Sequence, residues 1–125
     1  MTETKYFNPK EANRTLPLVR KIVEDILFEG REIKLIAKVF DGNLNDNPEV
    51  RARVDVIQGY LDELHEIGCY YKDFAYNVGL VDFPAIIDGE EVLLCWRSDE
   101  VSIRYYHHID AGYKGRKLIP AEYLD

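Results

Sequence analysis

The sequence has few cysteines and no long apolar run, and both shortages exclude classes of protein. Its two cysteines, Cys69 and Cys95, lie far apart and form no CxxC pair, so we expect free thiols in a reducing cytoplasm. No apolar run approaches the roughly 18 residues that a membrane-spanning helix needs. The polar start, residues 1–5, has no signal-peptide apolar segment, so we expect a cytoplasmic protein that is neither membrane-spanning nor exported.

Positive charge is also scarce. The chain has 16 Lys and Arg residues against 23 Asp and Glu residues, a net charge of −7. This balance argues against binding along a nucleic-acid backbone and against docking on an anionic membrane, so we expect neither partner. Hydrophobic residues make up 46% and charged residues 31% of the 125 residues. That composition excludes a disordered or collagen-like chain and predicts one globular domain over residues 1–125.

The first 68 residues carry two helix patterns whose ends are well marked. Each pattern opens with an asparagine N-cap, a proline at the first helical position and an acidic residue in the first turn. In the first helix the acidic residue completes a capping box. Apolar or small residues then recur at alternating spacings of four and three, which predicts a coiled-coil-like seam. The end signals are Asn8, Pro9 and Glu11 for the first helix, and Asn47, Pro48, Glu49 and Gly68 for the second.

The short linker over residues 41–47 forces the two helices into an antiparallel hairpin. Pairing about this linker places Gly30 opposite Ile57, where a small residue makes room for a large one. Val54 belongs to the same predicted seam. The first helix is the longer one, so its start is expected to overhang and to pack under the C-terminal half. Pro17 lies in this overhang and predicts a kink there.

The C-terminal half changes to strand-like patterns. Residues 91–96 and 101–107 are rich in β-forming residues and are joined by a polar segment, which predicts a β-hairpin. The dipeptide Asp88-Gly89 is a strong turn signal and implies a preceding strand over residues 84–87. Residues 69–74 are expected to add a short strand.

The fold class predicted from these patterns is α+β. An N-terminal antiparallel helical hairpin, coiled-coil-like, is expected over residues 1–68. It packs with a small antiparallel sheet and a loop over residues 69–125. We expect the tail after Arg116 to lack regular structure.

Short strings spread over most of the chain resemble one protein family in order and spacing. They are Tyr6-Phe7, Glu11-Ala12-Asn13, Leu16-Pro17, Lys72-Asp73, Gly79-Leu80-Val81-Asp82-Phe83-Pro84, Leu94-Cys95-Trp96-Arg97, Tyr106-His107, Asp110, Gly112 and Gly115-Arg116. The family is the bacterial domain of unknown function 2203 (DUF2203). The resemblance implies a small bacterial intracellular protein and brings no established activity. Two positions depart from the family pattern: Tyr106 stands where a tryptophan is usual, and His108 is additional.

His107 is the centre of the candidate site. On the predicted strand over residues 101–107 it follows the apolar face, whereas His108 follows the solvent face. A histidine that a carboxylate orients can act as a general base, and Asp110 and Asp82 are the candidate carboxylates. The same histidine can equally hold a metal ion, or it can form a hydrogen bond that simply closes the sheet.

Cationic and aromatic side chains near His107 are the candidate ligand contacts. Arg97 and Arg116 are candidates to bind a carboxylate or a phosphate. For Arg116 the favoured interpretation is that it pins its loop by pairing with Asp110 or Asp82. Trp96 and Asp73 complete the polar constellation.

We expect no metal ion and no cofactor. His107 and His108 are adjacent and point apart, and His65 lies on a helix, so the histidines have no metal-ligand spacing. Cys95 is expected to be a small packing residue within a strand rather than a nucleophile, although His107 on the facing strand is a potential partner. The Gly-x-x-Gly string over residues 112–115 is too short for a nucleotide fingerprint.

Apolar residues outside the seam of the first helix predict association. Phe28 and Leu35 are seven residues apart on the side away from the seam. A second copy of the hairpin is therefore expected to complete a four-helix bundle. The alternative is that the sheet covers these residues within one chain. The full set outside the seam is Ile22, Leu27, Phe28, Leu35 and Ile36.

Two classes of function follow from these patterns. The first is a dimeric scaffold, regulatory or small-ligand-binding module, in which the helices form a homodimer and the sheet offers a small polar pocket. The second is a small enzyme in which His107 is the base, Asp110 or Asp82 orients it, and Arg97 or Arg116 binds an anionic substrate. The two classes differ in whether His107, Asp82 and Arg97 converge in one concave site.

Overall fold

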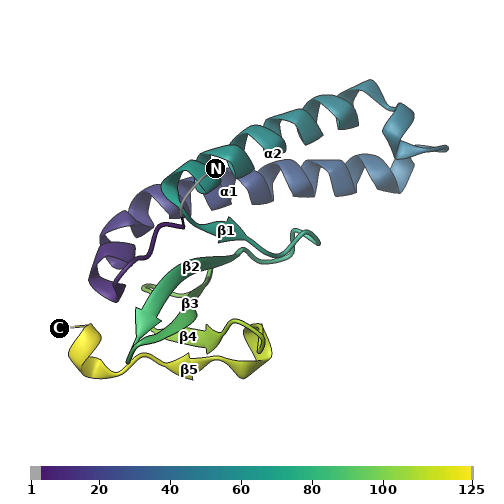
Figure 1. Ribbon diagram of the computed structural model, residues 1–125. Helices are drawn as coiled ribbons and strands as arrows, with labels where there is room; N and C mark the ends of the chain where they lie inside the picture. The colour runs from purple at the N-terminus through teal and green to yellow at the C-terminus, as the bar shows by residue number, and fades with distance from the viewer. Residues whose placement is uncertain (1–3, 125) are drawn as a thin grey trace.

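The structure is a computed structural model that describes residues 4–124. Two long helices form a hairpin that lies along one side of a five-stranded sheet (Figure 1). The α+β class and the helical hairpin are therefore confirmed. In chain order the elements are α1 (Pro9–Val39), η1 (Leu44–Asp46), α2 (Pro48–Ile67), β1 (Tyr70–Tyr71), β2 (Leu80–Ile87), β3 (Glu90–Arg97), β4 (Tyr105–His108), η2 (Tyr113–Gly115), β5 (Lys117–Leu118) and η3 (Ala121–Tyr123).

The helix ends lie where the capping signals placed them. The Asn8 side chain accepts the Glu11 amide at 2.8 Å, and the Glu11 carboxylate accepts the Asn8 amide at 3.2 Å, which closes the capping box. Asn47 caps α2 by accepting two backbone amides of its first turn. Gly68 ends α2 with a φ of 108°, a conformation that favours glycine. Pro17 lies inside α1, which continues past it to Val39.

The packing of the hairpin adds one contact to the predicted ones and corrects one predicted position. Gly30 makes room for the ring of Tyr76, which a side chain at position 30 would overlap. The loop before β2 packs on α1 at this point. The predicted pairing was counted from the linker between the two helices and did not include this loop. Val54 was assigned to the seam but is half exposed. The buried residues of α2 repeat every seven positions and are Val50, Ile57 and Leu64.

The sheet is an antiparallel meander in which each strand pairs with the next along the chain. The predicted turn at Asp88-Gly89 joins β2 to β3, and its two residues have positive φ values of 53° and 78°. This combination is typical of a two-residue hairpin turn. The turn fixes the register: Ile87 pairs with Glu90, and counting back from this pair places Asp82 opposite Cys95.

The strand predicted over residues 101–107 starts later than expected, at Tyr105. Residues 98–104 form a bent connection instead. Within this connection the backbone amide and carbonyl of Ile103 bind the Asn13 side chain of α1, at 2.8 and 3.1 Å. Because these groups are satisfied by a helix side chain, they need no neighbouring strand.

The tail after Arg116 forms regular structure, contrary to the prediction. Leu118 of β5 pairs with Tyr105 at the free edge of β4. Tyr123 lies in the 3-10 helix η3, and its hydroxyl donates a hydrogen bond to the Asp88 carboxylate at 2.6 Å. The tail is therefore tied to the turn between β2 and β3.

The core lies between α1 and one face of the sheet, which we call the inner face. The start of α1 packs here, as predicted for the overhang, and Arg20 of α1 lies over the Trp96 ring. No helix within residues 4–124 is long and apolar enough to cross a membrane. The inner face of β2 and β3 consists of Val81, Phe83, Ala85, Val92, Leu94 and Trp96, all buried.

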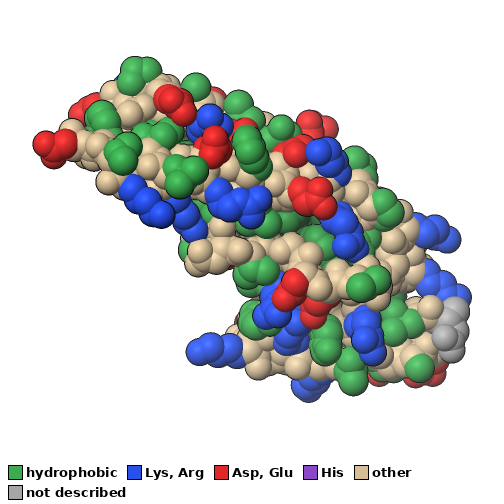
Figure 2. Space-filling view, turned by 180° about the vertical axis from the view of Figure 1, so that it is seen from behind, with side chains coloured by type: hydrophobic (Ala, Val, Ile, Leu, Met, Phe, Trp, Pro, Cys, Tyr) green, Lys and Arg blue, Asp and Glu red, His purple; other side chains and the backbone are tan. Residues whose placement is uncertain are grey.

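The side of the hairpin away from the core keeps apolar residues at its surface. Phe28 and Leu35 of α1 are 52% and 55% exposed, so the sheet does not cover them. Ile22 and Leu27 of the same predicted set are buried within the chain. Hydrophobic side chains also stand among charged ones along the hairpin in the space-filling view (Figure 2).

Candidate functional site

Three neighbouring strands bring Asp82, Cys95 and His107 together on the outer face of the sheet, the face opposite the helices. Asp82 of β2 lies opposite Cys95 of β3. His107 of β4 lies opposite Leu93, two residues before Cys95, so its side chain points to the same face. One nitrogen, sulfur or oxygen atom from each of the three residues lies within 4.8 Å of the other two.

This placement corrects the predicted face of His107. The alternation counted from residue 101 placed it on the apolar face that it would share with Ile103, and Ile103 is buried in the core. Residues 101–104 are not a strand, so that count does not extend to β4. His107 nevertheless is buried, on the outer face, where Ile109 and Tyr113 of the following segment lie near it.

The His107 ring has a defined orientation. The three side chains of Asp82, Cys95 and His107 are only 5%, 1% and 3% exposed. Nδ1 of His107 lies 2.8 Å from the backbone oxygen of His108. A carbonyl oxygen only accepts hydrogen bonds, so Nδ1 carries a proton, and Nε2 faces Asp82 Oδ1, 3.3 Å away. Attraction between Nε2 and Oδ1 requires a proton or another cation between them.

Burial changes the acidity of two groups at this site. It raises the pKa of the Asp82 carboxyl group, and the opposing effects of His107 and Lys72 do not cancel it. Burial also raises the pKa of the Cys95 thiol to about 12. The free thiol is therefore protonated at neutral pH and is a poor nucleophile.

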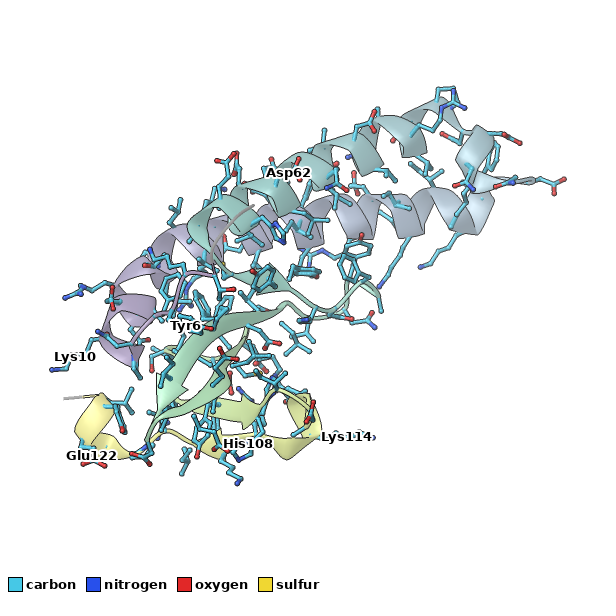
Figure 3. The ribbon with its side chains drawn as sticks, in the orientation of Figure 1. Tyr6, Lys10, Asp62, His108, Lys114 and Glu122 are labelled. Carbon is cyan, nitrogen blue, oxygen red and sulfur yellow. The ribbon has the colours of Figure 1, made fainter. Side chains whose placement is uncertain are left out.

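A pocket of about 200 Å³ opens over these three residues. At about 30 Å³ per water molecule, it accommodates a group of about six waters or a small organic molecule. It lies on the outer face of the sheet beside η2, the element that carries Lys114, and is remote from Asp62 on α2 (Figure 3). Its lining combines the polar atoms of the buried residues, apolar side chains and one lysine: Asp82, Cys95, His107, Leu80, Leu93, Ile109, Gly112, Tyr113 and Lys72.

Both arginines that were predicted to bind an anion are held outside this lining. Arg97 donates to the Asp99 carboxylate at 2.6 and 2.5 Å. Arg116 donates to both carboxylate oxygens of Glu100 at 2.8 Å and to the Cys95 backbone oxygen at 2.9 Å. Arg116 thus pins its loop, but its partner is a glutamate rather than the aspartate considered from the sequence. Asp82 and His107 converge in a concave site, and Arg97 does not join them.

The other three predicted residues also lie apart from the pocket. Trp96 is fully buried on the inner face, where its indole nitrogen donates to a backbone carbonyl at 2.9 Å. Asp73 accepts two backbone amides of its own loop, at 3.1 Å each. Asp110 is exposed in the turn after β4, and Asp82 is the carboxylate that contacts His107.

Sequence reasoning missed Cys95 and Lys72 as members of the site. The signal for Cys95 is the turn at Asp88-Gly89, because a two-residue turn fixes every pair of the hairpin that it closes. The strand before the turn was predicted to begin at Pro84, two residues too late to include Asp82. Lys72 stands in an irregular segment after β1, where no periodic pattern indicates its direction.

Comparison with known families matches residues 5–119 to the family described as "Uncharacterized conserved protein (DUF2203)". The chain belongs to this family. No curated protein and no solved structure matches it. The string from Gly79 to Pro84 that suggested DUF2203 contributes most of β2, including Asp82, and the string from Leu94 to Arg97 contributes the end of β3, including Cys95.

Proposed function

We propose that this DUF2203 protein is a small-ligand-binding module whose binding site is the pocket over Asp82 and His107. The observation that carries this proposal is a buried ionisable pair at a concave surface. Buried acids and bases with shifted pKa values gather at functional sites more often than elsewhere, because isolated burial of such groups is costly. A pair that only closed the sheet needs no pocket above it.

The lining indicates the chemistry of the ligand. Asp82 offers a carboxyl group and His107 an imidazole, so together they can both donate and accept hydrogen bonds. Leu80, Leu93 and Ile109 offer apolar contact, and Lys72 brings a positive charge. A small, partly apolar molecule that carries a carboxylate or another anionic group fits this combination.

Binding is favoured over catalysis by the state of the surrounding groups. The enzyme alternative needs an arginine to hold an anionic substrate, and Arg97 and Arg116 are both engaged in ion pairs. The Cys95 thiol is protonated because burial raises its pKa. Of the residues named in the enzyme alternative, His107 and Asp82 line the pocket.

We expect at least one member of a panel of small carboxylates, amides and inorganic phosphate to raise the melting temperature of the protein. Titration calorimetry with the best member then compares two histidine variants. His107→Gln should weaken binding about tenfold, the equivalent of one hydrogen bond of about 1.4 kcal/mol. His108→Gln is the matched control, because the next residue along β4 points to the other face, and it should bind like the wild type. Equal binding by both variants, or no binding by the wild type, would contradict the proposed site.

A second proposal is that two copies associate through the exposed side of the hairpin. Phe28 and Leu35, seven residues apart on α1, are the exposed members of the set that predicted association. A two-fold interface uses each residue twice, and full burial of a large apolar side chain contributes about 1.5–3 kcal/mol. This association would make the protein a dimeric scaffold that presents two pockets.

Phe28→Asp is expected to convert the dimer to a monomer in sedimentation while keeping the helical circular dichroism signal. The introduced charge must be desolvated in the interface but stays in water in the monomer. Phe74→Asp is the matched control: Phe74 is 58% exposed, lies outside both helices, and its variant should remain dimeric. A wild type that is monomeric at micromolar concentration would end this second proposal.

A further inference from the structure

We propose that Asp82, Cys95 and His107 bind one divalent metal ion of the zinc class and leave one coordination position open to the pocket. This inference deepens the proposed function, because it rests on the same pocket being the ligand site. It departs from the expectation of no metal site, which considered spacing along the chain. The three donors come from three different strands, and only the register of the sheet brings them together.

The distances between the donor atoms suit a tetrahedral ion. Zinc binds sulfur at about 2.3 Å and nitrogen or oxygen at about 2.0–2.2 Å, so neighbouring donors are about 3.4–3.6 Å apart. His107 Nε2 and Asp82 Oδ1 are already 3.3 Å apart. All three donors lie within 4.8 Å of one another, so the widest pair needs to close by at most about 1.4 Å.

The His107 ring is prepared as a metal ligand. Metal-binding histidines generally donate their other ring N–H to a carbonyl or a carboxylate, which fixes the ring and its tautomer. Nδ1 of His107 makes this bond to the His108 carbonyl at 2.8 Å. Nε2 faces Asp82 Oδ1 at 3.3 Å. A metal ion that replaces the proton between them is bound by both atoms at once.

The donor set also selects the ion. A thiolate and a carboxylate together cancel the charge of a divalent cation, so the loaded site is neutral in a buried environment. The sulfur and nitrogen donors disfavour magnesium and calcium, which prefer oxygen, and they suit zinc or cobalt. On binding, the sulfur–metal bond forms as the thiol proton leaves to solvent.

Three protein ligands leave room for a fourth. Zinc sites that bind a small molecule commonly keep one position for water or for that molecule. All three donors line the pocket, so a ligand entering it reaches the ion directly. An anionic ligand would then be held by the ion as well as by Lys72.

Cobalt is the probe for this site, because a cobalt–thiolate bond gives a charge-transfer absorption band that unbound cobalt lacks. We expect the reduced, metal-stripped full chain to develop this band on titration with Co²⁺, and Zn²⁺ added later should remove it. Equilibrium dialysis against Zn²⁺ followed by metal analysis should give one ion per chain. Absence of the band with the wild type at saturating Co²⁺ would overturn the inference without any variant.

The two cysteines provide a matched pair of variants. Cys95→Ala should lose the cobalt band and weaken Zn²⁺ binding at least about tenfold, whereas Cys69→Ala should keep both. Cys69 is also a buried free thiol, and it lies at the end of α2. If Cys95→Ala fails to fold, Asp82→Asn and His107→Gln should each weaken Zn²⁺ binding by a similar factor. Loss of the band in Cys69→Ala with retention in Cys95→Ala would overturn the assignment.

The ligand panel separates this inference from the proposed function. If the panel binds in the presence of a chelator and no ion binds, the metal inference is overturned and the proposed function stands. If one ion binds through Cys95 and no panel member binds to the loaded protein, the metal inference stands and the proposed ligand site fails.

Discussion

Replacing Ile57 with alanine is expected to lower the free energy of unfolding by about 2–4 kcal/mol. Ile57 is 3% exposed and belongs to the core cluster. Truncation removes its buried methyl and methylene groups and leaves a cavity that the rigid hairpin fills only in part. Urea denaturation followed by circular dichroism measures the loss.

Val54→Ala is the control for this prediction. Val54 lies one turn before Ile57 on α2 and is 49% exposed. Its truncation should cost less than about 0.5 kcal/mol, as is usual for surface positions. Equal losses of unfolding free energy in Ile57→Ala and Val54→Ala would mean that Val50, Ile57 and Leu64 do not form the buried face of α2.

Arg116→Leu is expected to cost about 3 kcal/mol of unfolding free energy, at the lower end of the range for breaking a buried ion pair. The side chains of Arg116 and Glu100 are 13% and 19% exposed, and their atoms approach to 2.8 Å. Without the guanidinium, Glu100 keeps its charge in a largely buried place, and the Cys95 carbonyl loses a donor. The arginine also packs on the Tyr105 ring, 4.0 Å from its centre.

Arg97→Leu is the control for this prediction. It shows whether the loss of stability in Arg116→Leu comes from the broken ion pair or from the loss of any arginine. Arg97 pairs with Asp99 closer to solvent, so water replaces the lost partner. The expected cost is below about 1 kcal/mol. The two variants remove the same charge, and thermal or urea denaturation should therefore separate them by about 2 kcal/mol. If they unfold alike, Arg116 does not pin its loop.

The helical half was predictable because its signals are local. Asn8, Asn47 and Gly68 act on backbone groups within one turn of themselves, so their positions alone fix where α1 and α2 begin and where α2 ends. The prediction that Gly30 makes room for Ile57 missed the contact with Tyr76 for the opposite reason. What touches Gly30 is a loop residue, Tyr76, that is distant in the sequence.

The site was predictable only in part, and the limit follows from the two connections of the sheet. The turn at Asp88-Gly89 is short, so the position of Asp82 opposite Cys95 follows from counting. The connection before β4 is long and bent, and its course depends on Asn13 holding Ile103. The direction of the His107 side chain toward Asp82 therefore depends on a residue of α1, which is distant in the sequence. The residues near His107 carry no signal of this contact.

The bond between Asn13 and Ile103 has a consequence for the protein during its synthesis. Its two residues are separated by 90 positions, so α1 leaves the ribosome long before its partner in the connection between β3 and β4 exists. Until β2 and β3 have emerged, the apolar stripe of α1 has only α2 to cover it, and the overhanging start of the helix stays in water. We expect the chain to close on the start of α1 only after residue 103 has emerged, and a ribosome stalled before residue 103 should carry a helical hairpin whose first turns are open to proteases.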